Sequence, residues 1–322
     1  MEYIIGIDGG GTKTKGYISD SSGNILGSAF SDTSNYLSAG IDKAEDSLNC
    51  VITKLCEKQN IEKNQIGLIS LGLAGAGREK SESIIRDMIK NIGINGEVIL
   101  NNDAYIALVG AHGKEEGIIT ISGTGSISLG SDGAGNLIRA GGWGHILGDE
   151  GSGYYFAREG LIAVLKHEDG RGNKTVIKEK VFNYLSIKKI DSLIEYVYNN
   201  LTMKNLISDL SPLIIESAEE GDIVANIIID KGLDELIVMT STIRSKLSET
   251  KDVALAGGVF EKSQLVKSKF IERLQLKDPS LQVIDNKYDN SVGSLIVGWK
   301  KRKINYNDKK ISEQIKRVLE YK

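Results

Sequence analysis

The chain opens with short apolar runs separated by turn residues. Residues 3–7 read Tyr-Ile-Ile-Gly-Ile and end at Asp8, and further runs occupy residues 15–19 and 25–30, the last after an Asp-Ser-Ser-Gly-Asn turn. Short apolar runs bounded by Asp, Asn, Ser and Gly predict strands joined by tight turns. The opening segment therefore predicts an antiparallel three-stranded meander.

A helix and a strand-helix-strand pattern follow this meander. Residues 41–59 carry apolar side chains three and four positions apart, the spacing of an amphipathic helix. The alternation that follows predicts a βαβ arrangement: a strand at 66–73, a helix at 79–91, a strand at 98–100 and a helix at 104–111.

The same order of elements starts again after residue 117. Three more strand-like runs, a mostly helical stretch and a second strand-helix alternation occur there, so the second half repeats the first. The final twenty residues predict an amphipathic closing helix. The predicted elements are strands at 118–122, 126–130 and 137–140, helices within 151–248, a strand at 253–256, a helix at 262–274, a strand at 282–284 and a helix at 291–302.

This duplication predicts an α/β fold with two domains. The chain has 322 residues, of which 40% are apolar, enough for two cores of ordinary domain size. We expect residues 1–113 to form the first domain and residues 114–290, with their helical insertion, to form the second. The closing helices at about 291–322 are expected to pack back on the first domain.

The charge balance excludes some partners. The chain carries 40 Lys and Arg against 43 Asp and Glu, without a basic field that would attract a phosphate backbone. An acid at Glu2 replaces the bases of a signal peptide, and no run approaches the ~20 apolar residues of a membrane span. We therefore expect a cytoplasmic protein that binds neither nucleic acid nor membranes. Cys50 and Cys56 fit neither a disulfide framework nor a four-ligand metal site.

Glycine is the residue type in excess. The chain has 37 glycines and only two prolines, and the glycines gather at 6–11, 72–77, 123–153 and 257–258, each time beside a strand-like run. Disordered or collagen-like chains would spread or repeat them. The pattern predicts a folded protein with several specialised loops.

The first of these loops lies between two strands. That context excludes the Walker A loop and the dinucleotide fingerprint, which both open a helix. Consecutive glycines let backbone N–H groups approach a bound anion, and a carboxylate beside them can hold hydrated Mg²⁺ on the same phosphates. A tight hairpin with an exposed acid is the alternative, but it needs only one glycine. The candidate phosphate ligands are Gly9, Gly10, Gly11, Thr12 and Lys13, with Asp8 holding Mg²⁺ through water.

Two further glycine turns follow in the second half. Gly123, Thr124 and Gly125 form a turn between strands at the position that corresponds to the first loop. Gly257 and Gly258 follow a buried strand and precede a helix, which suits close backbone approach by a flat ligand such as adenosine. Duplicated turns on a duplicated unit favour nucleotide binding over a purely structural role.

Taken in order, these turns resemble the phosphate-1, phosphate-2 and adenosine motifs of the ATPase core of sugar kinases, actin and heat-shock chaperones. Within that superfamily the chain resembles the N-acetylglucosamine kinase branch of the BadF and BadG ATPase family, over essentially its whole length to about residue 300. The resemblance implies two ribonuclease-H-like domains with mixed sheets and an ATP cleft between them. The segments that carry it are Gly6–Thr14, Thr33–Asn35, Asn101–Ala104, Ile121–Ser126 and Gly141–Ser152.

Asp103 is the candidate catalytic residue. It follows a strand and precedes a helix, where a carboxylate could accept the proton of an attacking sugar hydroxyl. Equally, Asn102 or Asp103 could cap the helix. The residues alone leave both roles open, and the resemblance implies that Asp103 is the general base.

The resemblance also implies the sugar-binding residues. Paired acids at Asp149 and Glu150 could cap the next helix or contact sugar hydroxyls; the family match assigns sugar contact to Asp149 and leaves Glu150 open. Trp143 could belong to a core or form a wall for one face of a sugar, and His145 is expected to have a structural role. The complete expected set is Asn35, Asp103, Gly125, Gly142, Trp143 and Asp149.

These features predict an enzyme that uses ATP and Mg²⁺ to phosphorylate the 6-hydroxyl of an amino sugar. N-acetylglucosamine is the expected substrate, with N-acetylmuramic acid and glucosamine as further candidates and a homodimer as the expected assembly. The alternative is an ATPase that activates 2-hydroxyacyl-CoA dehydratases or benzoyl-CoA reductases, but the two cysteines lack the context of an iron-sulfur site. A chaperone-like switch would need a further domain, and the cysteine-rich zinc motif of ROK kinases is missing.

Overall fold

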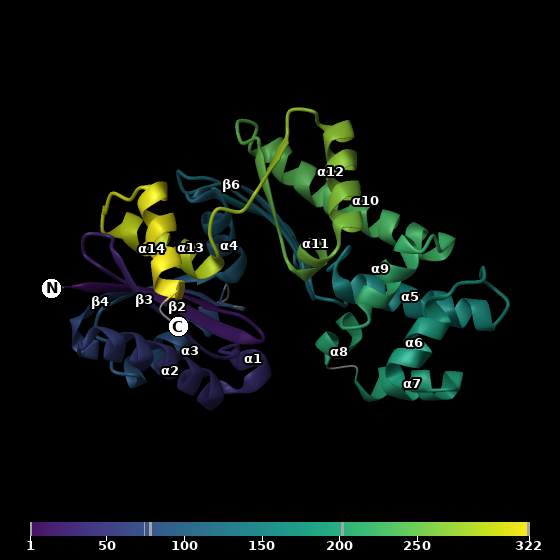
Figure 1. The fold of residues 1–322 in the computed structure, drawn as a ribbon, viewed down its shortest axis with the longest axis horizontal. Helices are drawn as coiled ribbons and strands as arrows, with labels where there is room; N and C mark the ends of the chain where they lie inside the picture. The colour runs from purple at the N-terminus through teal and green to yellow at the C-terminus, as the bar shows by residue number, and fades with distance from the viewer. Residues whose placement is uncertain (1, 74, 77–78, 201–202, 321–322) are drawn as a thin grey trace. The chain divides into compact units, whose positions relative to one another are not determined.

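The computed structural model describes residues 2–73, 75–76, 79–200 and 203–320. It separates into two compact units, the first formed by Met1–Gly117 with Asp285–Lys322 and the second by Ile118–Ile284. Each unit contains one five-stranded sheet flanked by helices (Figure 1). We call them unit 1 and unit 2 and describe each by itself.

The sheet of unit 1 is mixed. Its strands follow the order β3-β2-β1-β4-β5. β1, β2 and β3 pair antiparallel, which confirms the predicted meander, whereas β4 pairs parallel with both β1 and β5. Because β1, β4 and β5 run in the same direction, their carboxyl ends meet at one edge of the sheet. The strands are β1 (Tyr3–Gly9), β2 (Lys13–Asp20), β3 (Ile25–Asp32), β4 (Ile66–Leu73) and β5 (Glu97–Asn102).

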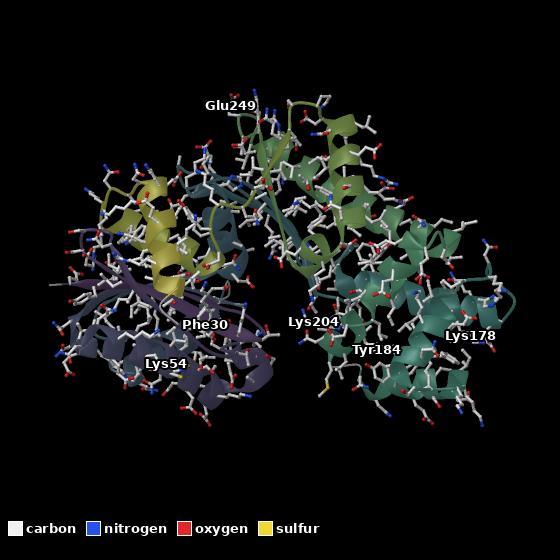
Figure 2. The ribbon with its side chains drawn as sticks, viewed as in Figure 1. Phe30, Lys54, Lys178, Tyr184, Lys204 and Glu249 are labelled. Carbon is white, nitrogen blue, oxygen red and sulfur yellow. The ribbon has the colours of Figure 1, made fainter. Side chains whose placement is uncertain are left out.

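Helices cover both faces of this sheet. Figure 1 shows α2 and α3 on one side and α13 and α14 on the other. The predicted apolar stripe of α2 is buried against the sheet, and Lys54 donates from Nζ to the carbonyl of Phe30 at 3.1 Å, tying α2 to β3 (Figure 2). The helices are α1 (Tyr36–Ala39), α2 (Ile41–Gln59), α3 (Glu79–Asn91), α4 (Asp103–His112), α13 (Asn290–Lys301) and α14 (Asp308–Glu320), with a 3₁₀ turn at Lys63–Gln65.

A close helix crossing brings the start of α13 into unit 1. A Cβ at Gly110 of α4 would lie 2.5 Å from the carbonyl oxygen of Asp289, and one at Gly293 would lie 2.5 Å from the Gly110 nitrogen. Only glycine permits such an approach. Farther along α13, Trp299 is fully buried and donates from Nε1 to Ser19 Oγ at 2.8 Å. The crossing thus fixes Asp289 at the edge where β1 and β5 end.

Unit 2 repeats the topology of unit 1. Its strand order is β10-β9-β6-β7-β8, the same succession of a three-strand segment and two parallel additions. β6, β9 and β10 pair parallel, and β7 pairs antiparallel with β8. This repetition confirms the predicted α/β fold with two mixed, helix-flanked sheets. The strands are β6 (Glu116–Ser122), β7 (Ser126–Asp132), β8 (Leu137–Gly141), β9 (Asp252–Ala256) and β10 (Gln282–Ile284).

The helices of unit 2 form its larger core. Buried hydroxyls link the sheet to α10, since Thr120 Oγ1 lies 2.9 Å from Ser128 Oγ and 2.7 Å from Thr240 Oγ1. The helix predicted at 262–274 corresponds to α12 (Gln264–Lys277), which begins two positions later because Ser263 is extended and caps it by accepting from Val266 N. The short helix α11 (Gly258–Lys262) directly precedes it. The helices are α5 (Gly153–Glu168), α6 (Ile177–Leu185), α7 (Ile190–Asn199), α8 (Lys204–Ser208), α9 (Ser211–Glu219), α10 (Ile223–Lys246), α11 (Gly258–Lys262) and α12 (Gln264–Lys277).

Within the described part of the chain, no helix combines the length and apolar character that a membrane crossing requires.

Candidate active site

The first glycine loop connects β1 to β2. Gly10 N donates to Lys13 O at 3.0 Å, which closes the turn. A Cβ at Gly9 would collide with Leu73 and Ser34, so this glycine is required by packing. At Gly11 nothing lies within 4 Å of an added Cβ, and neither Gly10 nor Gly11 has a left-handed backbone. The fold of unit 1 therefore leaves open space in front of this turn, where Gly11, Thr12 and Lys13 are exposed.

Asp8 lies at the carboxyl end of β1, where its surroundings disfavour the ionised form of the carboxyl group. Burial, together with the nearby carboxylates of Asp103 and Asp289, raises its pKa to about 7. A hydrogen bond from the Asn290 side chain and the charge of Lys13 act in the opposite direction. A nearby cation would stabilise the ionised form of an acid whose pKa is raised in this way, because an opposite charge favours ionisation. The site of Asp8 thus fits a hydrated divalent cation.

Asp289 and Asn290 are site residues that the sequence reasoning missed. Asp289 caps α13, accepting from Val292 N at 3.1 Å and from Ser291 Oγ at 2.7 Å. Its other carboxylate oxygen forms an ion pair with Lys15. Burial alone would raise the pKa of Asp289, but the charge and hydrogen bond of Lys15 hold it below its usual value. Lys15 therefore favours the ionised form of Asp289, and this charge acts on Asp8. The only sequence signal was the Asp-Asn-Ser run before an apolar helix, a cap pattern.

Asp103 is the first residue of α4, one position after β5 ends. The capping role belongs to Asn102, whose Oδ1 accepts from Ala104 N at 2.6 Å, although Asp103 Oδ1 also lies 2.9 Å from that nitrogen. The helix expected from Ala104 thus begins at Asp103. Asp103 is half-buried and close enough to Asp8 to raise the pKa of that acid. The structure therefore brings together two of the predicted residues, Asp8 and Asp103.

Asn35 is joined to the first glycine turn through Thr33. Thr33 Oγ1 donates to Gly10 O at 3.0 Å and accepts from Asn35 N at 3.1 Å. Asn35 caps the short helix α1 by accepting from Leu37 N at 3.1 Å. Its Oδ1 is thereby engaged in the cap. Thr33, to which the sequence assigns no role, thus links Asn35 to this turn.

The second glycine turn, between β6 and β7, is packed instead of open. Gly123 N donates to Gly125 O at 2.9 Å, and the start of α5 holds the turn from outside, with Gly153 N donating to Gly123 O at 2.7 Å. Tyr154 N donates to Thr124 O at 3.4 Å. The backbone carbonyls of this turn are therefore satisfied within unit 2, and its conformation is set before any ligand binds.

The Gly257-Gly258 turn lies against the second glycine turn. Gly257 has a left-handed backbone with φ of 95°, and a Cβ there would collide with Ser122 O and lie 2.9 Å from Gly123 N. Gly258, by contrast, has nothing within 4 Å of an added Cβ. Packing thus requires glycine at 257, and the space beside Gly258 is free. Within unit 2 the structure brings together the predicted phosphate-2 and adenosine motifs.

Asp149 is buried next to the second glycine turn. It is 4% exposed and has a left-handed backbone with φ of 61°, a conformation that costs a non-glycine residue about 1 kcal/mol or more. A Cβ at Gly125 would lie 2.8 Å from its Oδ2, and Ser126 N donates weakly to its Oδ1 at 3.4 Å. Ser152, and neither acid of the Asp149-Glu150 pair, caps α5. Strain held at a buried acid is typical of functional sites.

Trp143 does not belong to a core, because 65% of its surface is exposed. Gly142, with φ of 70°, turns the chain just before it, and a Cβ there would lie 2.8 Å from Ile127 Cδ1. The guanidinium of Arg139 stacks on the indole, 3.8 Å from the ring centroid. The His145 ring makes an edge contact with Tyr154, with centroids 4.8 Å apart, in keeping with a structural role.

The cysteines lie away from these loops, on α2. Cys56 is buried in the core of unit 1, and Cys50 is half-buried. Burial raises the pKa of the Cys56 thiol. Among the described residues, no group of three or more His, Cys, Asp and Glu side chains is arranged to hold a metal ion directly.

A family model matches residues 5–298, nearly the whole chain: the BadF/BadG/BcrA/BcrD ATPase family. The chain belongs to this family, which confirms the predicted resemblance.

Two relatives with assigned activities cover almost the full chain. An N-acetylmuramic acid/N-acetylglucosamine kinase of Clostridium acetobutylicum is 37% identical over 92% of this chain and 98% of its own length. An N-acetyl-D-glucosamine kinase of Dictyostelium discoideum is 33% identical over 94% of this chain and 99% of its own length. Together with the family these relatives confirm the predicted enzyme class, an ATP-dependent sugar kinase of the N-acetylglucosamine kinase type.

Solved structures agree on the fold. A Chromobacterium violaceum protein, 24% identical, superimposes with a TM-score of 0.75 over 92% of this chain and 99% of its own. The ROK hexokinase of Thermus thermophilus, 13% identical, gives a TM-score of 0.58 over 92% of this chain and 97% of its own. At these identities the likeness concerns the fold alone.

Proposed function

We propose that the protein transfers the γ-phosphate of ATP to the 6-hydroxyl of an amino sugar, with N-acetylglucosamine and N-acetylmuramic acid as the substrates to test first. The relatives named above act on these sugars. A third relative, the glucosamine kinase of Vibrio cholerae, is 29% identical over 82% of this chain and makes glucosamine a further candidate.

The glycine turns are assigned to ATP. In the open turn after β1 and the preformed turn after β6, Gly10 N and Gly123 N close the turns by donating to Lys13 O and Gly125 O. The backbone N–H groups of Gly11, Thr12 and Thr124 in the same turns are assigned to the phosphates. The free space beside Gly258 suits the adenosine. Asp8, whose ionisation is costly without a nearby cation, would hold Mg²⁺ through water. When bound, Mg²⁺ neutralises the charge that develops on the transferring phosphoryl group.

Asp103 is assigned the role of general base. A half-buried carboxylate at the start of α4 can orient the sugar 6-hydroxyl and accept its proton as it attacks phosphorus. Asn102 supplies the side-chain cap of α4, and Asp103 follows it as the first residue of the helix.

Sugar binding is assigned to Asn35, Gly125, Gly142, Trp143 and Asp149. Asp149 accepts hydrogen bonds from hydroxyls, and Trp143 provides an apolar wall for one sugar face. The single observation that carries this assignment is the buried, left-handed Asp149 pressed against Gly125.

Release of ADP tests the proposal. The purified protein with Mg·ATP would be assayed with N-acetylglucosamine, N-acetylmuramic acid, glucosamine, N-acetylmannosamine and glucose. We expect strong stimulation by one or two amino sugars. Hydrolysis that is independent of sugar would contradict the proposal and favour a protein-activating ATPase.

A further inference from the structure

Arg139 is an exposed arginine that lies in the loop region assigned to sugar binding. It is on β8, four positions before Trp143, and its guanidinium carbon lies 3.8 Å from the centroid of the indole ring. Gly141 and Gly142, both left-handed with φ of 72° and 70°, reverse the chain between them. Two such glycines fold the indole back over the strand, so this stack is built into the backbone.

The stack leaves the hydrogen-bonding groups of Arg139 available. A guanidinium that packs on a ring uses its face, and its N–H donors point outward in the plane. In the described part of the chain no hydrogen bond or ion pair is recorded for Arg139. Other arginines of the protein pair with carboxylates: Arg86 with Glu82, Arg158 with Glu159, Arg171 with Asp169, Arg273 with Asp230 and Arg302 with Glu97.

A guanidinium held in this way can bind a carboxylate, and one candidate substrate carries such a group. N-acetylmuramic acid is N-acetylglucosamine with a lactyl ether at the 3-hydroxyl, and its carboxylate is ionised at neutral pH. The same loop contains two acids, Asp149 and Glu150, that repel an anionic sugar. Recognition of the lactyl carboxylate therefore requires a fixed positive group beside the sugar wall.

We propose that Arg139 is a specificity-determining residue that binds the carboxylate of lactyl amino sugars through its in-plane N–H donors while it stacks on Trp143. The inference rests on the proposed function, in which Trp143 and Asp149 bind the sugar. Planar arginine donors match a carboxylate in a bidentate manner, which lysine cannot reproduce.

Specificity kinetics test this proposal. The value of kcat/KM would be measured for N-acetylmuramic acid and for N-acetylglucosamine with the wild type, Arg139→Gln, Arg139→Lys and the control Arg171→Gln. We expect Arg139→Gln to lower the ratio of the two values about 10- to 100-fold, the worth of a charged hydrogen bond. Arg139→Lys should restore part of that loss. Arg171 is on the surface of unit 2, paired with Asp169, so its variant should leave the ratio unchanged.

Other outcomes overturn the proposal and separate it from the proposed function. If Arg139→Gln lowers kcat/KM equally for both sugars and leaves the thermal midpoint unchanged, the arginine only positions Trp143. A ratio that does not move, or a wild type that phosphorylates N-acetylglucosamine alone, also contradicts carboxylate binding. If the wild type phosphorylates neither sugar, the proposed function fails. Calorimetric binding of N-acetylmuramic acid then decides alone, since it should weaken about tenfold or more in Arg139→Gln if Arg139 holds the carboxylate.

Discussion

The two glycine turns occupy the same position in two sheets of the same topology, yet they differ in kind. The turn after β1 is open at Gly11 and lies next to Asp8, whose pKa is raised by burial and by two further acids nearby. The turn after β6 is neutral, held by the start of α5 and pressed against Gly257.

The two units of this duplicated fold therefore have different roles in the proposed site. Unit 1 concentrates negative charge at the carboxyl ends of β1 and β5, where the chemistry is proposed to occur. Unit 2 instead fixes backbone geometry, with Gly257 and the strained Asp149 locked around its turn. We therefore expect substitutions in unit 1 to change reaction rates and ligand affinity. Substitutions in unit 2 should change stability and sugar binding.

The largest expected effect is that of Asp103→Asn. Removal of a general base should lower kcat about 10²- to 10⁴-fold, while the affinity for Mg·ATP measured by calorimetry stays nearly the same. Asp42→Asn, another acid in the first turn of a unit 1 helix, is the control and should keep full activity. Joint loss of ATP binding and activity in Asp103→Asn would show that Asp103 is structural.

Gly257→Ala should destabilise the protein by about 2–4 kcal/mol, because the new Cβ meets backbone atoms of Ser122 and Gly123. Gly221→Ala is a matched control: its φ is 90°, but nothing lies within 4 Å. The control isolates the cost of the left-handed backbone, about 1 kcal/mol. Chemical denaturation measures both. Equal losses for the two variants would mean that the contact between the turns of unit 2 contributes nothing.

Asp8→Asn should stabilise the protein at high pH. The pKa of Asp8 is raised from 3.8 to about 7, so the folded state binds more protons than the unfolded state between these values. Stability then falls as pH rises through that window. Without Mg²⁺ and nucleotide, the variant should gain on the order of 4 kcal/mol over the wild type at pH 8 and nothing near pH 3. A gain in stability that does not depend on pH would contradict the raised pKa of Asp8.

Gly11→Ala should have the smallest effect, and one confined to function. No atom lies within 4 Å of the added Cβ, so the thermal midpoint should shift by about 1 °C or less. The same methyl group should intrude on the phosphates and raise the KM for ATP about fivefold, near 1 kcal/mol. A lower thermal midpoint with unchanged KM would reverse the roles given to the two turns.

Local patterns were enough to predict most elements and both glycine turns. Apolar runs of three to eight residues and their turn residues are visible along the chain, and the duplication makes the same pattern appear twice. The start of α12 was predicted two positions early, at 262, because the helical pattern continues across Ser263 and only its extended backbone separates α11 from α12.

The unpredicted parts of the site depend on tertiary packing. Lys15 and Asp289 are 274 positions apart in sequence and meet only because α13 crosses α4 and lies against β1. The stack of Arg139 on Trp143 needs two successive left-handed glycines, and the pattern Gly-Gly does not by itself disclose their φ angles. Charge partners brought together by long-range contacts leave no local periodicity to detect.

The most direct test of the central claim is the identity of the product. N-acetylglucosamine, Mg·ATP and the wild-type protein would be incubated and the sugar product analysed by phosphorus-proton correlation in NMR. We expect one phosphomonoester coupled to the two protons on carbon 6, formed in equal amount with ADP. A phosphate coupled to the anomeric proton, or inorganic phosphate with unmodified sugar, would contradict it.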